Sequence, residues 1–225
     1  MLSDISSRSL NGRSPGRSAA PGSRTVHIID DEEPVRDSAT ALLEAAEFDV
    51  VAHASGAAFL SALDQATPGC ILLDIHMPEL TGLELQQLLN QRKLNWPVIV
   101  LTGQGDVATA VQAMKGGAFE FLEKPYRSEA LLATVAEAFD KFSAMTEESE
   151  RTASARALID SLTSREKQVM QGLLAGLPNK LIGFKLGISA RTVDVYRANV
   201  MDKLNARGLS AAVRVALDAR LEPLE

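Results

Sequence analysis

Short apolar runs alternate with stretches of helical periodicity between Arg24 and residue 142. The apolar runs read TVHIID, DVVAHAS, GCILLDI, PVIVLTG and AFEFLEK, and the stretches between them include PVRDSATALLEAAEF and LELQQLLNQR. Nearly continuous apolar strands separated by helices are typical of a parallel sheet that is covered on both faces. The pattern therefore predicts an α/β fold for residues 24–142, a (βα)5 doubly wound parallel sheet.

After residue 157 the strand pattern ends, and short helices follow one another. Their boundaries are marked by a capping-box spacing from Thr163 to Glu166, a helix stop at Gly187 and an N-cap at Ser189. The pattern predicts an all-α domain of four helices over residues 158–225. The predicted helices span 164–175, 179–186 and 190–204, and the fourth begins at Ser210.

Two segments fit neither pattern. Residues 1–23 are rich in serine, glycine, proline and arginine and have no apolar periodicity, which predicts a disordered arm. The same composition also fits an organelle transit peptide. Residues 143–157 are polar, and we interpret them as a linker, with a continuation of the preceding helix as the alternative.

Charge is divided unequally between the two predicted domains. Residues 25–142 carry 18 acidic and 7 basic side chains, a net charge of −11, whereas residues 158–225 carry 7 and 10, a net charge of +3. An acidic domain suits a cation site, and a basic domain suits a polyanion. No apolar run approaches the roughly 18 residues of a membrane span, so we expect a cytoplasmic protein with no membrane partner. Cys70 is the single cysteine, and a disulfide framework or a zinc cluster needs more than one.

Acidic side chains follow two strands of the predicted sheet. Asp30 and Asp31 close the first strand, and Asp74 closes the third. In a doubly wound sheet these strand ends meet at one edge, where ligands bind. Clustered carboxylates repel one another, and a bound divalent cation reduces this repulsion. Mg²⁺ is a hard ion that prefers such oxygen ligands. The sequence therefore predicts a Mg²⁺ site.

Two further strand ends offer groups that suit phosphoryl chemistry. Thr102 provides a hydroxyl, and Lys124 provides an ammonium that can pair with a phosphate oxygen. A cation held by the carboxylates would neutralise charge during in-line transfer of a phosphoryl group. The five side chains together indicate a phosphoryl-transfer site.

The segments VHIIDDEEP, LLDIHMPELTG, VIVLTGQGD and FEFLEKP resemble the successive signature segments of receiver domains in bacterial two-component response regulators. The resemblance covers nearly all of residues 24–142. It implies that Asp74 accepts a phosphoryl group from the phosphohistidine of a sensor histidine kinase. It also implies that Asp30, Asp31 and Asp74 hold Mg²⁺ together with the main-chain carbonyl of His76.

The same resemblance assigns roles to the later strand ends. Thr102 and Lys124 would contact the phosphate, and Phe121 would take the place of an aromatic switch residue. Without a hydroxyl, Phe121 can signal only through packing, and the alternative is an ordinary strand phenylalanine. The resemblance also implies a cis peptide bond between Lys124 and Pro125, and a solvent-facing side chain for His76.

Residues 162–204 resemble the LuxR-type helix-turn-helix segment over their whole length. Helical spacing places Val193, Tyr196, Val200 and Leu204 on one face of the recognition helix, as a core stripe. The opposite face is the candidate for the DNA major groove, where Asp194 could accept from cytosine and Val195 could contact a thymine methyl. For Asp194 a charge that complements the helix dipole is an equal alternative. The candidate DNA-binding residues are Lys180, Arg191, Thr192, Asp194, Val195, Arg197, Asn199 and Lys203, of which Lys180, Arg191, Arg197 and Lys203 are suited to phosphates.

The order of the two modules resembles the NarL/FixJ class of response regulators, nearest its FixJ-type branch. The resemblance implies a transcription factor, not an enzyme, that dimerises on phosphorylation and binds paired half-sites on double-stranded DNA. RNA polymerase is a further candidate partner. Two alternatives remain open: a DNA-binding regulator with a phosphorylation-independent receiver, and a phosphohydrolase with Asp74 as a transient nucleophile.

Overall fold

The described residues form two compact units, which divide between Asp140 and Lys141. The computed structural model describes residues 24–103 and 107–224, so the predicted arm over residues 1–23 lies outside the described residues. In the described part of the chain, no helix is both long enough and apolar enough to span a bilayer.

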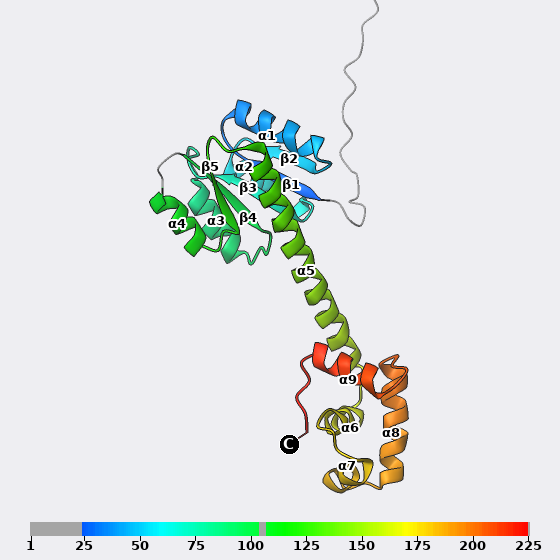
Figure 1. Ribbon diagram of the computed structural model, residues 1–225. Helices are drawn as coiled ribbons and strands as arrows, with labels where there is room; N and C mark the ends of the chain where they lie inside the picture. The colour runs from blue at the N-terminus through cyan, green and yellow to red at the C-terminus, as the bar shows by residue number, and fades with distance from the viewer. Residues whose placement is uncertain (1–23, 104–106, 225) are drawn as a thin grey trace, which may run out of the picture. The chain divides into compact units, whose positions relative to one another are not determined.

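The first unit is built on a parallel sheet of five strands in the order β2-β1-β3-β4-β5 (Figure 1). The strands are β1 (Thr25–Ile29), β2 (Asp49–His53), β3 (Gly69–Asp74), β4 (Val98–Thr102) and β5 (Glu120–Glu123). They are connected by α1 (Glu33–Ala45), α2 (Gly56–Ala62) with a 3₁₀ turn (Leu63–Gln65), α3 (Gly82–Gln91) and α4 (Val107–Lys115), and α5 (Ser128–Asp160) follows β5. The predicted (βα)5 doubly wound fold is confirmed.

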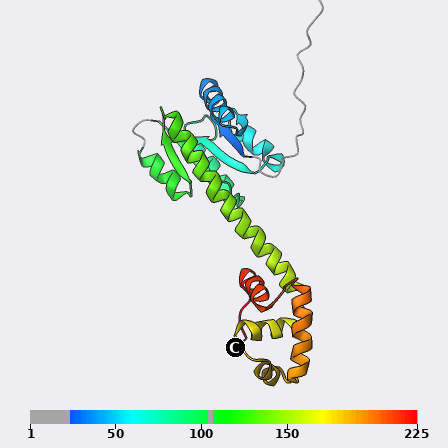
Figure 2. The same cartoon turned by 45° about the vertical axis from the view of Figure 1, so that its right-hand side comes forward.

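Helices cover both faces of this sheet (Figure 2). On one face, α1 and α5 pack Leu43 and Leu131 against Ile28 of β1. On the other face, α2, α3 and α4 enclose a core that contains Phe59 and Leu85. Full burial of such a side chain contributes about 1.5–3 kcal/mol. Asp74 and Thr102 are the last residues of two fully buried strands, β3 and β4.

Helix α5 runs from Ser128 to Asp160 without interruption. Residues 143–157 lie inside it, so the helical alternative describes this segment, and no irregular linker forms here. The segment SAMTEESERTASARA is mostly polar and buries only Ala155 among its apolar residues, but alanine, methionine, glutamate and arginine all have high helix propensity.

The second unit is helical, as predicted. It contains the last turns of α5 and the helices α6 (Ser164–Leu174), α7 (Asn179–Leu186), α8 (Ala190–Lys203) and α9 (Leu209–Asp218). The capping box of Thr163 and Glu166 forms, and Ser189 caps α8. Gly187 ends α7 in the left-handed region, with φ +67°, where a side chain would be strained. The predicted core stripe of α8 is confirmed, because Val193 and Val200 are fully buried in this unit.

Candidate functional site

The predicted acidic and basic side chains meet at the carboxyl ends of the sheet strands. Asp30 directly follows β1, Asp74 is the last residue of β3, Thr102 is the last residue of β4, and Lys124 directly follows β5. Because β1, β3, β4 and β5 are parallel neighbours, these ends lie along one edge of the sheet. The chain contributes to this edge from positions almost one hundred residues apart.

Lys124 joins two of the carboxylates. Its Nζ donates to Asp30 Oδ2 and to Asp74 Oδ1, at 2.7 Å each, and lies 4.0 Å from Glu32 Oε1. The side chain of Asp30 is 0% exposed and that of Asp74 is 7% exposed, whereas Lys124 is 20% exposed. Asp30 Oδ1 also accepts from the Glu32 main-chain N–H at 2.9 Å. The ammonium therefore neutralises part of the charge of two buried acids.

The pKa of Lys124 reflects two opposed effects. Burial acts to lower this pKa, but hydrogen bonds to Asp30 and Asp74 and attraction by their charges outweigh it. The pKa is raised above its ordinary value, so Lys124 is an ammonium at neutral pH.

The acidic edge has the donor chemistry of a Mg²⁺ site. Asp30 and Asp74 supply carboxylate oxygens, and Asp31 lies exposed beside them. Within residues 24–103 and 107–224, no three acidic, histidine or cysteine side chains form a group that could hold a metal as they stand. Two buried carboxylates against one ammonium leave excess negative charge, which a divalent cation would complement.

Thr102 and Phe121 lie next to this edge. Thr102 is buried, and its hydroxyl donates to the Gly103 carbonyl at 3.0 Å. Thr102 and Phe121 both line a cavity of about 380 Å³ against α4. Phe121 is exposed there, as are Val107 and Met114 of α4. The cavity thus lies between the end of β4, at Thr102, and the exposed apolar side chains of α4 and β5.

Two smaller expectations from the receiver resemblance can be compared directly with the structure. The peptide bond between Lys124 and Pro125 is cis, as implied. The side chain of His76 is exposed two residues after Asp74, as expected.

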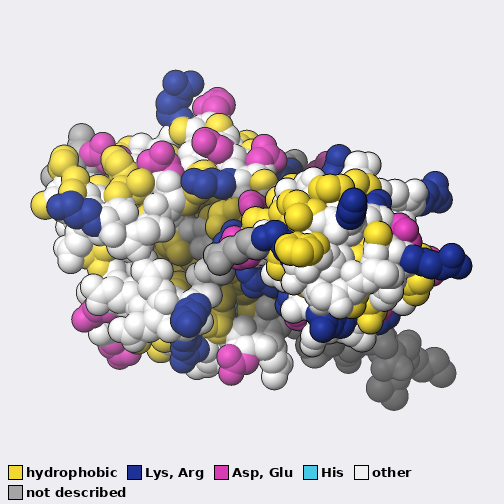
Figure 3. Space-filling view, turned by 90° about the horizontal axis from the view of Figure 1, so that it is seen from below, with side chains coloured by type: hydrophobic (Ala, Val, Ile, Leu, Met, Phe, Trp, Pro, Cys, Tyr) yellow, Lys and Arg dark blue, Asp and Glu magenta, His cyan; other side chains and the backbone are white. Residues whose placement is uncertain are grey.

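The candidate DNA-binding residues lie on α7 and α8. Arg191, Asp194, Val195 and Asn199 of α8 are exposed, and so is Lys180 of α7. Thr192 and Arg197 are half-buried. Figure 3 shows hydrophobic side chains gathered on the face of this unit that is seen from below, with Lys and Arg side chains around them.

Three of these residues make contacts inside the unit. Asn179 Nδ2 donates to Asp194 Oδ1, and Arg197 Nη1 donates to Asn179 Oδ1 at 2.6 Å. Lys203 Nζ donates to Glu166 Oε2 at 2.7 Å, and the side chain of Glu166 is only 5% exposed. The hydrogen bond from Lys203, followed by the one from the Thr163 main chain, lowers the pKa of Glu166. Lys203 therefore pairs with a buried acid of its own unit.

Family models match both units. The model for the response regulator receiver domain matches residues 26–136, and that for bacterial regulatory proteins of the luxR family matches residues 160–216. The transcriptional regulatory protein FixJ of Azorhizobium caulinodans is 45% identical over 91% of this chain and 97% of its own length. FixJ of Rhizobium meliloti is 43% identical over 88% and 98%.

The chain belongs to the FixJ-like response regulators. Its fold agrees with this family: full-length FixJ from B. japonicum, 42% identical, matches 88% of this chain and 97% of its own with a TM-score of 0.57. The response regulator StyR, 37% identical, matches 87% and 99% with a TM-score of 0.79. This protein is a response regulator that joins a receiver domain to a LuxR-type DNA-binding domain and acts as a transcription factor.

Sequence reasoning missed the polar contacts that two side chains make inside the DNA-binding unit. It used Glu166 only as a helix cap, although this residue also pairs with Lys203. It assigned no role to Asn179, which contacts two recognition-helix side chains. The partners lie 15 to 37 residues apart, so no local pattern in the sequence indicates them.

Proposed function

We propose that Asp74 accepts a phosphoryl group from a cognate sensor histidine kinase, and that phosphorylation promotes receiver dimerisation and DNA binding. The observation that carries this proposal is the position of Asp74. It is a nearly buried carboxylate at a strand end, and one oxygen shares the Lys124 ammonium with Asp30. Such a group is held in place for in-line attack.

The transfer exchanges one bond of phosphorus for another. A carboxylate oxygen of Asp74 forms the P–O bond while the P–N bond to the kinase histidine breaks, and its electron pair returns to the imidazole nitrogen. The product is an acyl phosphate on Asp74. Lys124 then pairs with a phosphoryl oxygen, because the carboxylate that it contacts in the resting state has lost its charge.

Receiver domains generally use Mg²⁺ for this reaction. In our proposal Asp30, Asp31 and Asp74 hold it with the His76 main-chain carbonyl, and the exposed Asp31 side chain turns toward the edge. When bound, Mg²⁺ neutralises charge on the phosphoryl oxygens during transfer.

The phosphorylated state is transmitted through Thr102 and Phe121. The Thr102 hydroxyl leaves the Gly103 carbonyl and donates to the phosphoryl group, and Phe121 repacks in the cavity that both residues line. This changes the surface of α4 and β5 and favours a receiver dimer. Two linked DNA-binding domains then engage paired half-sites, which raises their effective concentration on DNA.

The recognition helix α8 enters the major groove in this proposal. Arg191, Thr192 and Val195 lie toward its amino-terminal end, where such helices contact base edges. Lys180 and Asn199 contact phosphates at the rim, and Arg197 uses the guanidinium N–H groups that Asn179 does not bind. Asp194 and Lys203 are assigned to contacts inside the domain.

RNA polymerase is the further partner that we propose for the DNA-bound protein. Phe184 on α7 is 84% exposed and lies one helical turn from the exposed Leu181, with Lys180 and Lys185 on either side. A large apolar side chain in this position suits a protein contact better than a phosphate. Phe184→Ser should leave DNA affinity unchanged but alter transcription from a purified template. Equal transcription would exclude this surface.

The phosphoryl-transfer proposal is tested by intact mass over time. Full-length protein is mixed with Mg²⁺ and a small phosphodonor, and Asp74→Asn is compared with Asp64→Asn, an exposed acid in the same unit. We expect a single phosphoryl adduct on wild type and Asp64→Asn and none on Asp74→Asn. Donor consumption without an adduct would support the phosphohydrolase, and no reaction would support a phosphorylation-independent receiver.

A further inference from the structure

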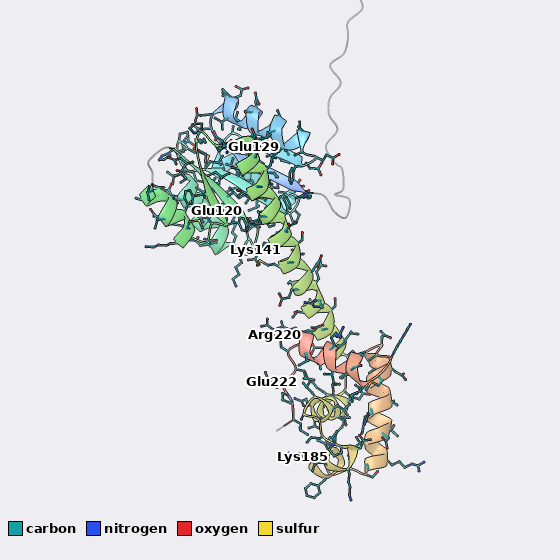
Figure 4. The ribbon with its side chains drawn as sticks, in the orientation of Figure 1. Glu120, Glu129, Lys141, Lys185, Arg220 and Glu222 are labelled. Atoms are coloured by element: carbon teal, nitrogen blue, oxygen red, sulfur yellow. The ribbon has the colours of Figure 1, made fainter. Side chains whose placement is uncertain are left out.

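The side chain of Asn179 lies between two side chains of the recognition helix. Its Nδ2 donates to Asp194 Oδ1, and its Oδ1 accepts from Arg197 Nη1 at 2.6 Å. Asp194 and Arg197 are three residues apart on α8 and therefore share one face of that helix. Figure 4 shows α7, with Lys185, beside the first turns of α8.

An amide is matched to these two neighbours. It is the group that offers a donor to a carboxylate and an acceptor to a guanidinium at the same time. A carboxylate at position 179 would keep the bond from Arg197 but would repel Asp194. The chemistry of the three side chains is thus interdependent.

We propose that Asn179 is a specificity-determining positioning residue for DNA recognition. It turns Asp194 toward α7, so that this carboxylate does not accept from a cytosine. It also fixes the plane of the Arg197 guanidinium, whose remaining N–H groups can then bind one place on the DNA in a fixed, forked geometry. The inference rests on the proposed role of α8 in the major groove.

Close packing of the backbone and of buried apolar side chains holds α7 against α8. A Cβ on Gly183 would lie 2.7 Å from the Ile188 carbonyl oxygen, so the turn between the helices is closely packed. Ile182 and Val193 are fully buried in the same core. Substitution of the half-buried Asn179 should therefore leave the fold intact and change the direction of two side chains.

The test swaps the amide and the carboxylate between positions 179 and 194. Duplexes are first selected from a randomised pool by the phosphorylated full-length wild type. The dissociation constants for a selected and an unrelated duplex of equal length, and the melting temperature, are then measured. The variants are Asn179→Asp, Asp194→Asn and the double variant, with Asp202→Asn as the matched control, because Asp202 is an exposed acid on the same helix.

We expect Asn179→Asp to lower the ratio of unrelated to selected dissociation constants by about tenfold or more, which is about 1.4 kcal/mol. In the double variant an amide at 194 can donate to a carboxylate at 179, which still accepts from Arg197. The ratio should return to within about threefold of wild type. Asp194→Asn and Asp202→Asn alone should change it by less than about threefold.

Three results would overturn the inference. A large loss in Asp194→Asn would mean that Asp194 contacts a base directly. An unchanged ratio in Asn179→Asp would mean that the amide has no part in specificity. Equal loss of affinity for both duplexes with a lower melting temperature, unrepaired in the double variant, would mean a purely structural role. If the wild type selects no duplex at all, it is the proposed DNA-binding function that fails.

Discussion

Lys124 is the residue on which the charge balance of the acidic edge depends. Lys124→Met leaves the carboxylates of Asp30 and Asp74 without their shared partner. We expect the free energy of unfolding to fall by on the order of 1–3 kcal/mol at neutral pH. Mg²⁺ should raise the melting temperature of the variant more than that of wild type, because the ion replaces the lost positive charge. If Mg²⁺ raised the melting temperatures of wild type and Lys124→Met by the same amount, this expectation would be contradicted.

The pH dependence of this contribution follows from the raised pKa of Lys124. A raised pKa in the folded state stabilises the protein fully below the unfolded value of about 10.4. The stabilisation is lost as the pH rises through the folded value. The difference in stability between wild type and Lys124→Met should therefore shrink only in strongly alkaline buffer.

Lys203 is expected to act on stability through its bond to Glu166. Lys203→Met leaves a buried carboxylate without its cation and should lower the free energy of unfolding by about 1 kcal/mol, because the Lys203 side chain is itself 38% exposed and solvent screens the pair. The matched variant Lys180→Met removes an exposed lysine and should lower the salt dependence of DNA binding by about one unit instead. Denaturant titrations and DNA titrations at several salt concentrations separate the two effects. If Lys203→Met were as stable as wild type and its DNA affinity depended less on salt concentration, Lys203 would be a phosphate contact instead.

The lowered pKa of Glu166 gives this pair the opposite dependence on pH. Its contribution is present above the unfolded pKa of about 4.3 and is lost as the pH falls through the folded value. Lys203→Met and wild type should therefore become similar in stability in acid.

The sequence predicted the residues of the acidic edge because their positions follow from the topology. In a parallel sheet, Asp30, Asp74 and Lys124 must lie at the same edge once the strands are known. It did not predict which side chains pair. The bonds of Asn179 depend on the angle and distance between two helices, which the pattern of apolar positions does not specify.

At the scale of elements, α3 begins in direct contact with the end of β3. The Gly82 main-chain N–H donates to the Ile75 carbonyl at 2.9 Å, and a Cβ on Gly82 would lie 2.2 Å from the Asp74 carbonyl oxygen. Gly82→Ala must therefore displace the backbone that carries Asp74. We expect a loss of more than about 1 kcal/mol in stability and a slower formation of the phosphoryl adduct.

The matched control for this change is Gly208→Ala, since a Cβ on Gly208 meets no described atom within 4 Å and Gly208 lies outside the receiver unit. Thermal unfolding and the mass time course are measured on both variants. Adduct formation at the wild-type rate in Gly82→Ala would show that the close contact between α3 and β3 does not position Asp74.

The elements themselves were largely predictable from periodicity. The predicted helices at 179–186 and 190–204 agree with α7 and α8 to within one residue. The segment 143–157 was harder to predict, because its polar composition is common to linkers and to exposed helices. Its residues are good helix formers, and α5 continues through them.

At the scale of the whole molecule, the net charge of each unit agrees with the ligand that we propose for it. The acidic receiver carries the proposed phosphoryl site, and the basic unit carries the LuxR-type helices. Family models match both units, and FixJ proteins are similar along almost the whole chain. In our proposal phosphorylation acts on DNA affinity through dimerisation, because two weak half-site contacts would become one strong bivalent contact.

The central claim is that phosphorylation of Asp74 controls DNA binding. The most direct test is a titration of a selected duplex with wild type and Asp74→Asn, each with and without a small phosphodonor and Mg²⁺. The account predicts that the donor tightens wild-type binding by at least about tenfold and leaves Asp74→Asn unchanged. Equal affinities of phosphorylated and unphosphorylated wild type would contradict it.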